Sequence, residues 1–503
     1  MRGRLTVKIG VIGIDPGYYP ALERISRLFF ETCHFIAIEE EKDSYTLTLH
    51  FHAESNQPPQ LTLTEQLTGK TWYSPVATTQ TNANAKMEKQ KEMKQQLGCA
   101  LLNVLQAYTG IQQPWGILTG IRPTKLYHRY YLDGLSPAQI EERLQHVYKV
   151  TPEKTALLRE IVTQQQQAIP DLYDLQDSVS IYIGIPFCPT KCAYCTFPAY
   201  AISGQTGSVE DFLAALHEEI EAIGEWLAQK QLKITTVYFG GGTPTSISAN
   251  QLDQLLAKCQ TALPAYQQIR ELTVEAGRPD TLDTEKLAVL KQRNVDRISI
   301  NPQSFRELTL KQIGRHHTVR ETIEKYYLAR EMGLNNINMD LIIGLPNEDL
   351  DTFQQSLQFI KELQPESLTV HALSFKRGSY LSQNKEKYHF ASHEETAKMV
   401  QLARKQAKQM GYRPYYLYRQ SQILGNQENV GYALPGKESL YNILMMEERQ
   451  SILGLGCGAV SKLVHPTTGK ITRWANPKEP NMYLRKYQTH IEGKIEALNQ
   501  LYD

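Results

Sequence analysis

The stretch that decides the fold is IYIGIPFCPTKCAYCTF, residues 181–197, in which three cysteines lie within eight residues. Cys188, Cys192 and Cys195 form a C-x3-C-x2-C array directly after a run of mostly apolar residues. Three thiolates on one loop can bind three irons of a four-iron, four-sulfur cluster and leave the fourth iron open. Zinc accepts the same thiolates but normally takes four protein ligands at structural sites. The spacing alone leaves an iron–sulfur cluster, a zinc site and accidental clustering open.

The residues that follow the array continue a repeating pattern of short β-branched runs and amphipathic helical stretches. The six runs expected to be strands are 179–185, 234–239, 271–275, 297–301, 337–343 and 367–373. Such alternation predicts βα units and a parallel sheet. Six units are too few for a closed eight-stranded barrel, so we expect an open, partial (β/α)6 barrel. In parallel barrels the chemistry lies at the C-terminal ends of the strands, and the cysteine array directly follows the first run.

The flanking regions have a different character and predict two further domains. Residues 1–170 mix strand-like runs with helical spacing, which predicts an α+β and helical domain whose role the sequence does not give. The barrel is expected over 171–378. Residues 379–503 are expected to form a mainly helical domain that covers the substrate. A tyrosine-rich stretch, 412–418, could stack on a ligand or pack against the barrel.

The composition argues against several classes of partner. Across 503 residues, 54 Lys and Arg nearly balance 53 Asp and Glu, so no dominant attraction to nucleic acid or to an anionic membrane is expected. No window approaches the roughly 20 apolar residues of a membrane span. The cysteines outside the array, which are isolated in sequence, are Cys33, Cys99, Cys259 and Cys457. An odd cysteine count with one tight cluster predicts a reducing, cytoplasmic location.

Glycine or polar residues follow the ends of the later runs. The segment FGGGTPT, 239–245, has three glycines that would let backbone amides approach a ligand, although a glycine triplet taken alone favours a tight turn. The lysine of a phosphate-binding loop is missing, so these glycines better suit the amino and carboxylate groups of S-adenosylmethionine (SAM). Glu275, Gln303 and Asp340 end later runs. A carboxylate at the end of a buried run is costly unless it is paired or bound, which makes these residues candidate ligand contacts.

Further motifs occur in a fixed order with the array and the glycine turn: TVEA at 273–276, ISINPQSF at 298–305, IGRHH at 313–317 and NMDLIIGLP at 338–346. Together they resemble the radical SAM enzymes of the oxygen-independent coproporphyrinogen III oxidase group over roughly residues 178–470. The length and the long N-terminal region are most similar to the Bacillus-type coproporphyrinogen dehydrogenase variant of that group.

The resemblance implies a role for each matched residue. Cys188, Cys192 and Cys195 would ligate a 4Fe-4S cluster with an open fourth iron. Gly241 and Glu275 would contact a first SAM, with Tyr182 nearby. A second SAM position would be lined by Tyr194, Gly242, Thr243, Gln303, Arg315 and Asp340, with Ala372 and Val460 near further contacts. The candidate catalytic residues are Tyr182, Glu275, Gln303, Arg315 and Asp340.

The resemblance also implies a reaction in heme biosynthesis. A 5′-deoxyadenosyl radical would start the oxidative decarboxylation of two propionates of coproporphyrinogen III to vinyl groups, giving protoporphyrinogen IX. The expected partners are the tetrapyrrole and an unidentified electron donor, with no nucleic acid.

Two residues depart from the pattern of the group. Gly184 stands where relatives commonly have His, and Phe197 stands where well-studied oxidases carry a fourth Cys. Three alternatives are a radical SAM enzyme for another tetrapyrrole, a zinc-stabilised interaction module, and a heme chaperone. Chaperones of the related branch carry a His-Asn-x-x-Tyr motif, whereas residues 440–445 here read LYNILM.

Overall fold

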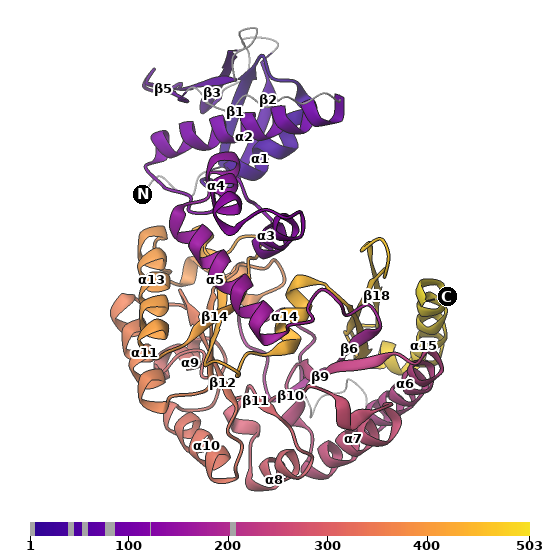
Figure 1. Cartoon of the computed structure of the whole chain (residues 1–503). Coiled ribbons are helices and arrows are strands. Elements are labelled where there is room, and N and C mark those ends of the chain that lie inside the picture. Colours follow the sequence, from indigo (N-terminus) through magenta and orange to yellow (C-terminus); the bar gives the residue numbers. More distant parts are fainter. Residues whose placement is uncertain are drawn as a thin grey trace. The chain divides into compact units, whose positions relative to one another are not determined.

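The computed structural model describes residues 6–38, 45–52, 59–75, 86–120, 122–201 and 208–502. The chain divides into two compact units, Met1–Arg159 and Glu160–Asp503, and the division falls inside helix α5 (Pro152–Ala168) (Figure 1). None of the helices among these residues has the length and apolar character needed to cross a membrane.

The first unit is built on a five-stranded sheet in the order β2-β1-β3-β4-β5. Strand β1 (Thr6–Ile12) pairs in parallel with β2 (Thr32–Ala37) and β3 (Leu47–His52), and β4 (Gln60–Glu65) and β5 (Thr71–Tyr73) continue the sheet antiparallel. Helices α1 (Tyr19–Ser26) and α2 (Lys86–Thr109) pack on each other and share one apolar core with the sheet. Helices α3 (Pro123–Leu132) and α4 (Pro137–Tyr148) follow.

The second unit contains the expected parallel sheet. Its six central strands lie side by side in chain order and are all parallel: β6 (Ser178–Ile185), β9 (Lys233–Gly241), β10 (Glu271–Glu275), β11 (Arg297–Ser299), β12 (Ile337–Ile343) and β13 (Ser367–Ala372). The helices between them lie around the outer side of the curved sheet (Figure 1): α6 (Val209–Lys230), α7 (Ala249–Ala262), α8 (Thr284–Gln292), α10 (Val319–Glu331) and α11 (Leu350–Leu363). The prediction of a partial (β/α)6 barrel is confirmed.

The sequence starts each of these outer helices in the same way. A Ser, Thr or Asp precedes the first helical residue, and its side-chain oxygen accepts a hydrogen bond from the amide three residues later. The capping residues are Ser208, Ser248, Asp283, Thr318 and Asp349. These local caps explain why the helix positions could be predicted from the sequence.

Five strands after residue 379, which the sequence analysis did not identify, extend the sheet at both ends. Strands β14 (Arg413–Tyr418) and β15 (Asn429–Ala433) lie beyond β13, while β16 (Ser451–Gly456), β17 (Val460–Val464) and β18 (Ile471–Ala475) lie beyond β6. Strand β14 is the tyrosine-rich stretch. The helices here are α12 (Tyr380–Gln383), α13 (His393–Gln409), α14 (Leu440–Glu447) and α15 (Pro480–Tyr502).

A buried carboxylate joins the last helix to the barrel. Glu219 on α6 accepts hydrogen bonds from Lys494 of α15, from the Tyr483 hydroxyl at 2.6 Å and from the Gly456 amide at 2.8 Å. Burial alone would raise the pKa of Glu219, but these donors hold it below its usual value. The carboxylate is therefore charged, and it ties α15 and β16 to α6.

The two faces of the central strands differ in chemistry. One face is aliphatic, and its fully buried residues include Ile181, Ile183, Val237, Val274, Met339 and Leu341. The alternate positions carry polar side chains that bond to one another between strands, as Thr236 does with Ser180 at 2.8 Å and Arg297 with Ser367 at 3.0 Å. Because side chains alternate along a strand, the outer helices cover the aliphatic face and the barrel interior is polar.

Candidate functional site

The cysteine loop is anchored to several segments of the second unit. Two short strands, β7 (Phe187–Cys188) and β8 (Tyr200–Ala201), pair at its ends. In the middle, the Ala193 amide donates to the Ile313 carbonyl at 2.9 Å, and the Ala193 carbonyl accepts from the Leu381 amide at 3.0 Å. The loop conformation is therefore fixed from both sides of the array.

The array carries three free thiols in different surroundings. Cys188 is buried, whereas Cys192 and Cys195 are partly exposed. Burial raises the pKa of Cys188 to about 11, and the neighbouring Cys192 and Cys195 add to this rise. The Thr243 hydroxyl, whose Oγ1 lies 3.3 Å from Cys188 Sγ, partly opposes it. Burial and the neighbouring cysteines therefore favour the neutral thiol of Cys188, and a bound metal cluster would instead favour the thiolate.

The donor set fits an iron–sulfur cluster. Thiolate sulfur is the ligand such clusters use, and all three thiols are uncombined and close enough to influence one another's charge. Among the described residues, no three His, Cys, Asp or Glu side chains are grouped around one point tightly enough to bind a single metal ion. The three cysteines are instead spread along the loop.

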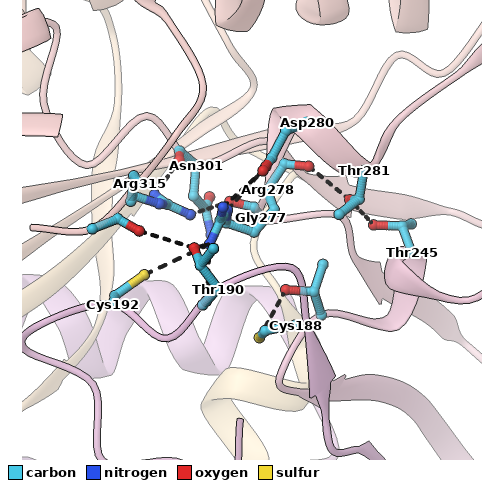
Figure 2. A network of polar contacts seen from close by, with 12 residues as sticks. Cys188, Thr190, Cys192, Thr245, Gly277, Arg278, Asp280, Thr281, Asn301 and Arg315 are labelled. Atoms are coloured by element: carbon cyan, nitrogen blue, oxygen red, sulfur yellow. Dashed lines mark hydrogen bonds and ion pairs between the residues drawn. The ribbon is translucent and has the colours of Figure 1, made fainter. Parts of the chain in front are cut away.

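Arg278, which follows the end of β10, contacts the loop from the sheet side. Figure 2 shows its guanidinium between Asp280 and the loop residues Thr190 and Cys192. Its Nη1 donates to the Thr190 carbonyl at 3.2 Å and lies 4.0 Å from Cys192 Sγ. Thr190 in turn donates to the Gly314 carbonyl at 2.9 Å. The C-terminal end of β10 is thereby joined to the cysteine array.

The glycine turn at the end of β9 packs closely against the start of the cysteine loop. A Cβ at Gly242 would lie 2.5 Å from the Phe187 carbonyl oxygen and 3.1 Å from Cys188 Sγ, and Gly241 has φ +109°. The amides of Gly242 and Thr243 donate to the carbonyls of Ile185 and Phe187, each at 2.7 Å. Those two amides are used within the protein, so the glycines are needed for the approach of backbone to backbone.

Three tyrosines stack on the polar face beside Glu275. Tyr238 and Tyr441 have ring centroids 4.3 Å apart at 20°, and Tyr182 lies 6.2 Å from both. The Tyr238 hydroxyl donates to Glu275 Oε1 at 2.6 Å. Burial raises the pKa of Glu275 to about 7, although the hydrogen bond from Tyr238 opposes it and nearby Asp340 adds to it. This carboxyl therefore titrates near neutral pH.

Asp340 is held by a second chain of polar contacts. Asn338 donates to Asp340 Oδ1 at 2.7 Å, His371 Nε2 lies 3.5 Å from Oδ2, and the Tyr418 hydroxyl lies 3.0 Å from His371 Nδ1. Burial alone would raise the pKa of Asp340, but His371 and Asn338 lower it below its usual value. Unlike Glu275, Asp340 is ionised at neutral pH.

Gln303 and Arg315, which follow β11 in the chain, are each held by backbone groups. Arg315 donates to the carbonyls of Asn301 at 2.7 Å and Gly277 at 2.6 Å (Figure 2). Gln303 has φ +68° and donates its amide to the Asp340 carbonyl at 2.9 Å. The buried atoms Arg315 Nε, Gln303 Oε1 and Asn301 Oδ1 have no hydrogen-bond partner within the described residues. A polar ligand would satisfy such atoms.

The remaining sequence-predicted residues, Tyr194, Ala372 and Val460, differ in burial and in their distance along the chain from the cysteine array. Tyr194 lies between Cys192 and Cys195, half-buried, and burial raises its pKa well above the usual value. Ala372 is buried at the end of β13, and its amide donates to Asn429 Oδ1 at 2.9 Å. Val460 is 36% exposed at the start of β17. Among the described residues, no hydrogen bond or ion pair joins Ala372 or Val460 to the cysteine loop.

The two positions that depart from the family pattern have structural neighbours. A Cβ at Gly184 would lie 3.0 Å from the Cys457 carbonyl oxygen, because β16 runs beside β6 there. Phe197 is 58% exposed, and Lys376 Nζ lies 5.6 Å from its ring centroid. A larger residue at 184 would push against the end of β16, whereas position 197 faces solvent.

Sequence reasoning missed four residues that the structure places at this site: Thr190, Tyr238, Arg278 and Tyr441. Arg278 had the most visible signal, because it comes three residues after Glu275 in the strand-end segment EAGRPD. Tyr441 is distant in sequence from Tyr238 and Glu275, and only the fold brings α14 to β9.

The comparisons with known proteins bear on this arrangement. The family model of the Radical SAM superfamily matches residues 182–360, which begin in β6 and end in α11. Over 505 residues, which cover 99% of both chains, the sequence is 51% identical to the oxygen-independent coproporphyrinogen-III oxidase-like protein HemZ of Bacillus subtilis. The chain belongs to the radical SAM family. The resemblance to the oxygen-independent coproporphyrinogen III oxidase group is confirmed.

Two further relatives of this radical SAM protein extend the comparison. The heme chaperone HemW of Bacillus subtilis is 33% identical over 56% of this chain and 70% of its own. The solved coproporphyrinogen III oxidase HemN of Escherichia coli superposes with a TM-score of 0.51 at 20% identity, over 65% of this chain and 72% of its own. This second likeness shows the fold. Membership of the family implies a 4Fe-4S cluster and SAM.

Proposed function

We propose that this radical SAM protein catalyses the oxygen-independent oxidative decarboxylation of two propionates of coproporphyrinogen III, which gives the vinyl groups of protoporphyrinogen IX. The observation that carries the proposal is that the C-terminal ends of two neighbouring strands both contact the cysteine loop, β9 through Thr243 and β10 through Arg278. The 51% identity to an oxidase-like protein over the full length supports the choice of substrate.

Cys188, Cys192 and Cys195 would hold the cluster, since they are the three thiols on the anchored loop. When bound, the cluster and SAM would supply a 5′-deoxyadenosyl radical to remove a propionate hydrogen, and loss of carbon dioxide with transfer of one electron to a one-electron acceptor would then give the vinyl group. The protein's own contribution is to bind these groups, orient them and exclude water.

The polar face offers groups that complement SAM. Glu275 and Asp340 present carboxylates suited to the cationic amino group and to ribose hydroxyls. Arg315 Nε and Gln303 Oε1, which lack partners within the described residues, add a donor and an acceptor. The rings of Tyr182, Tyr238 and Tyr441 stack beside Glu275, and Tyr238 donates a hydrogen bond to its carboxylate.

Two cations beside the loop suit a substrate that carries carboxylates. Lys191 and Lys376 lie close enough to Cys195 to lower its pKa, against the larger effect of burial, which raises it. A propionate that approaches the cysteine loop would meet these ammonium groups, which form charge-assisted hydrogen bonds with carboxylates. They would hold the side chain near the reacting group.

The test is an anaerobic assay of the reconstituted full-length protein with SAM, dithionite and coproporphyrinogen III. We expect 5′-deoxyadenosine together with porphyrinogens that have lost one and two carboxylates, measured by chromatography and mass spectrometry. Cys192→Ala should abolish both products. The control is Cys457→Ala, which removes a buried thiol outside the array and should retain them. Deoxyadenosine from the wild type without loss of any carboxylate would reject the decarboxylase assignment.

The identity to HemW supports a second candidate function, the binding and transfer of heme. In this chain Tyr441-Asn442 stands where the chaperone motif has His-Asn, and Tyr441 is already stacked on Tyr238. Titration with hemin under the same anaerobic conditions separates the two functions. Tight, stoichiometric heme binding without conversion of coproporphyrinogen III would favour the chaperone.

A further inference from the structure

Arg278 is a buried cation whose N–H donors bind Asp280 on one side and the cysteine loop on the other. Its side chain is 3% exposed. Nε donates to Asp280 Oδ1 at 2.9 Å and Nη2 to Asp280 Oδ2 at 2.7 Å, so the carboxylate occupies one side of the guanidinium. The remaining nitrogen, Nη1, faces the cysteine loop, where it meets the Thr190 carbonyl, the Thr190 hydroxyl and Cys192 Sγ (Figure 2).

Asp280 fixes the direction in which the charge points. A planar guanidinium bound through two parallel hydrogen bonds has one defined orientation. Although burial opposes it, Arg278 holds the pKa of Asp280 below its usual value, so the pair is ionised. The positive end of the pair faces Cys192 and the negative end faces away, with the Asp280 side chain 21% exposed.

Such an oriented pair acts on any charge that changes at the cysteine loop. Inside a protein a unit charge a few ångströms away changes a neighbour's free energy by more than it would in water. The side-chain hydrogen bonds of Arg278 end on the cysteine loop and on Asp280. Its effect must therefore pass through the loop that carries the thiols.

We propose that Arg278, oriented by Asp280, is a positioning residue that raises the reduction potential of the iron–sulfur cluster held by the cysteine loop. The inference rests on the cluster assignment made under the proposed function. In the step concerned, one electron passes from a low-potential one-electron reductant to the oxidised cluster, whose charge becomes one unit more negative. No bond forms or breaks and no proton is transferred. A nearby cation stabilises the more negative state.

The test measures the midpoint potential of the reconstituted full-length protein, without substrate, from the EPR signal of the reduced cluster at a series of set potentials. In Arg278→Gln the ratio of reduced to oxidised cluster at a fixed potential should fall about tenfold, which for a one-electron couple is about 59 mV. Asp280→Asn removes the opposing negative charge, so the same ratio should rise. Arg278→Lys keeps the charge without the fork and should lie between Arg278→Gln and the wild type.

A matched control comes from a similar ion pair outside the site. Arg293 binds Asp253 through two hydrogen bonds of 2.6 and 2.8 Å at partly exposed positions. Arg293→Gln should leave the potential unchanged. A purely structural role for Arg278 predicts loss of cluster in both site variants, and it does not predict shifts of opposite sign.

The outcomes separate this inference from the proposed function. A fall in Arg278→Gln with a rise in Asp280→Asn supports the tuning role, and unchanged potentials or shifts of the same sign overturn it while leaving the cluster assignment intact. If Arg278→Gln takes up no cluster, the Asp280→Asn variant alone tests the tuning role, because the midpoint potential of its cluster must still rise above that of the wild type. A wild type that forms no 4Fe-4S cluster on reconstitution overturns both proposals.

Discussion

Tyr238 on β9 donates a 2.6 Å hydrogen bond to Glu275 on the neighbouring strand β10, and this bond stabilises the ionised form of that carboxyl. Burial and the charge of Asp340 act in the opposite direction and raise the pKa of Glu275 to about 7. At the candidate SAM site, Glu275 therefore titrates near neutral pH, whereas Asp340 stays ionised there.

This balance predicts a pH dependence of SAM binding. The carboxylate of Glu275 is populated above about pH 7, so the Kd for SAM should fall as the pH rises through that value. Glu275→Gln should weaken binding by roughly tenfold to 100-fold at pH 8, as expected for a lost hydrogen bond to a charged group, and should abolish the pH dependence. In Tyr238→Phe the midpoint should move to higher pH, because the donor that lowers the pKa is gone. Calorimetric titration of the reconstituted wild type and of the two variants with SAM measures these Kd values across pH. If Glu275→Gln kept the wild-type pH midpoint of SAM binding, Glu275 would not be the titrating group.

The same carboxyl should influence stability in the absence of SAM. Its folded-state pKa of about 7 lies above the ordinary value of 4.5, so the folded protein retains a proton that the unfolded chain releases between these values. The free energy of unfolding should therefore fall as the pH rises from about 4.5 to about 7, by on the order of 2 kcal/mol relative to Glu275→Gln. Urea unfolding of both proteins across this window measures the difference. Parallel curves would contradict the raised pKa.

Gln303 predicts a separation of stability from binding. Its φ of +68° costs a non-glycine residue about 1–2 kcal/mol, which a glycine would not lose. The greater flexibility of glycine in the unfolded chain offsets about 0.4–1 kcal/mol of that advantage. Gln303→Gly should therefore leave the melting temperature unchanged or higher while SAM affinity falls. Gln364, which ends α11 at φ +52° and is exposed, provides the control. Gln364→Gly should have the same effect on melting and none on SAM binding. A lower melting temperature in Gln303→Gly alone would show that the side chain is structural.

The buried pair between α6 and α15 predicts a large loss of stability. Lys494→Met would leave the Glu219 carboxylate charged and buried without its cation, which typically costs about 3–5 kcal/mol. The double variant Glu219→Gln with Lys494→Met should recover much of the loss, because the unpaired charge is gone. Lys233 and Asp177 form an exposed pair, so Lys233→Met should change stability by less than about 1 kcal/mol. Urea midpoints of the four proteins compare these costs, and a double variant no better than Lys494→Met would refute the charge argument.

The barrel could be predicted because its signals are local. Val237, Phe239, Leu341 and Ile343 lie in short runs, and side chains such as Ser248 and Asp349 start the helices between them. The cysteine array and Glu275 likewise lie at strand ends, where parallel topology places chemistry. Asp340, which we expected at the end of a run, lies instead in the middle of β12. Their proximity follows from the order of the strands, which the sequence contains.

The remaining parts depend on contacts between distant segments. Strand β16 contains three apolar residues and two glycines, SILGLG, and becomes a strand because β6 offers an unpaired edge. Tyr441 reaches Tyr238 only because Glu271 of β10 accepts hydrogen bonds from the amides at the start of α14. The sequence analysis assigned the glycine turn to SAM binding, whereas the amides of Gly242 and Thr243 donate to the carbonyls of Ile185 and Phe187. None of these partners lies near the other in sequence.

The alternation of the barrel strands has a consequence for how this chain can change. In β6, β9 and β12 the odd-numbered positions, such as Ile183, Val237 and Leu341, pack against helices, while the even-numbered Tyr182, Tyr238 and Asp340 face the interior. Substitutions at the odd-numbered positions are expected to weaken the packing of the sheet on its helices. Those at the even-numbered positions leave that packing intact, so they would test the proposed site on an unchanged scaffold.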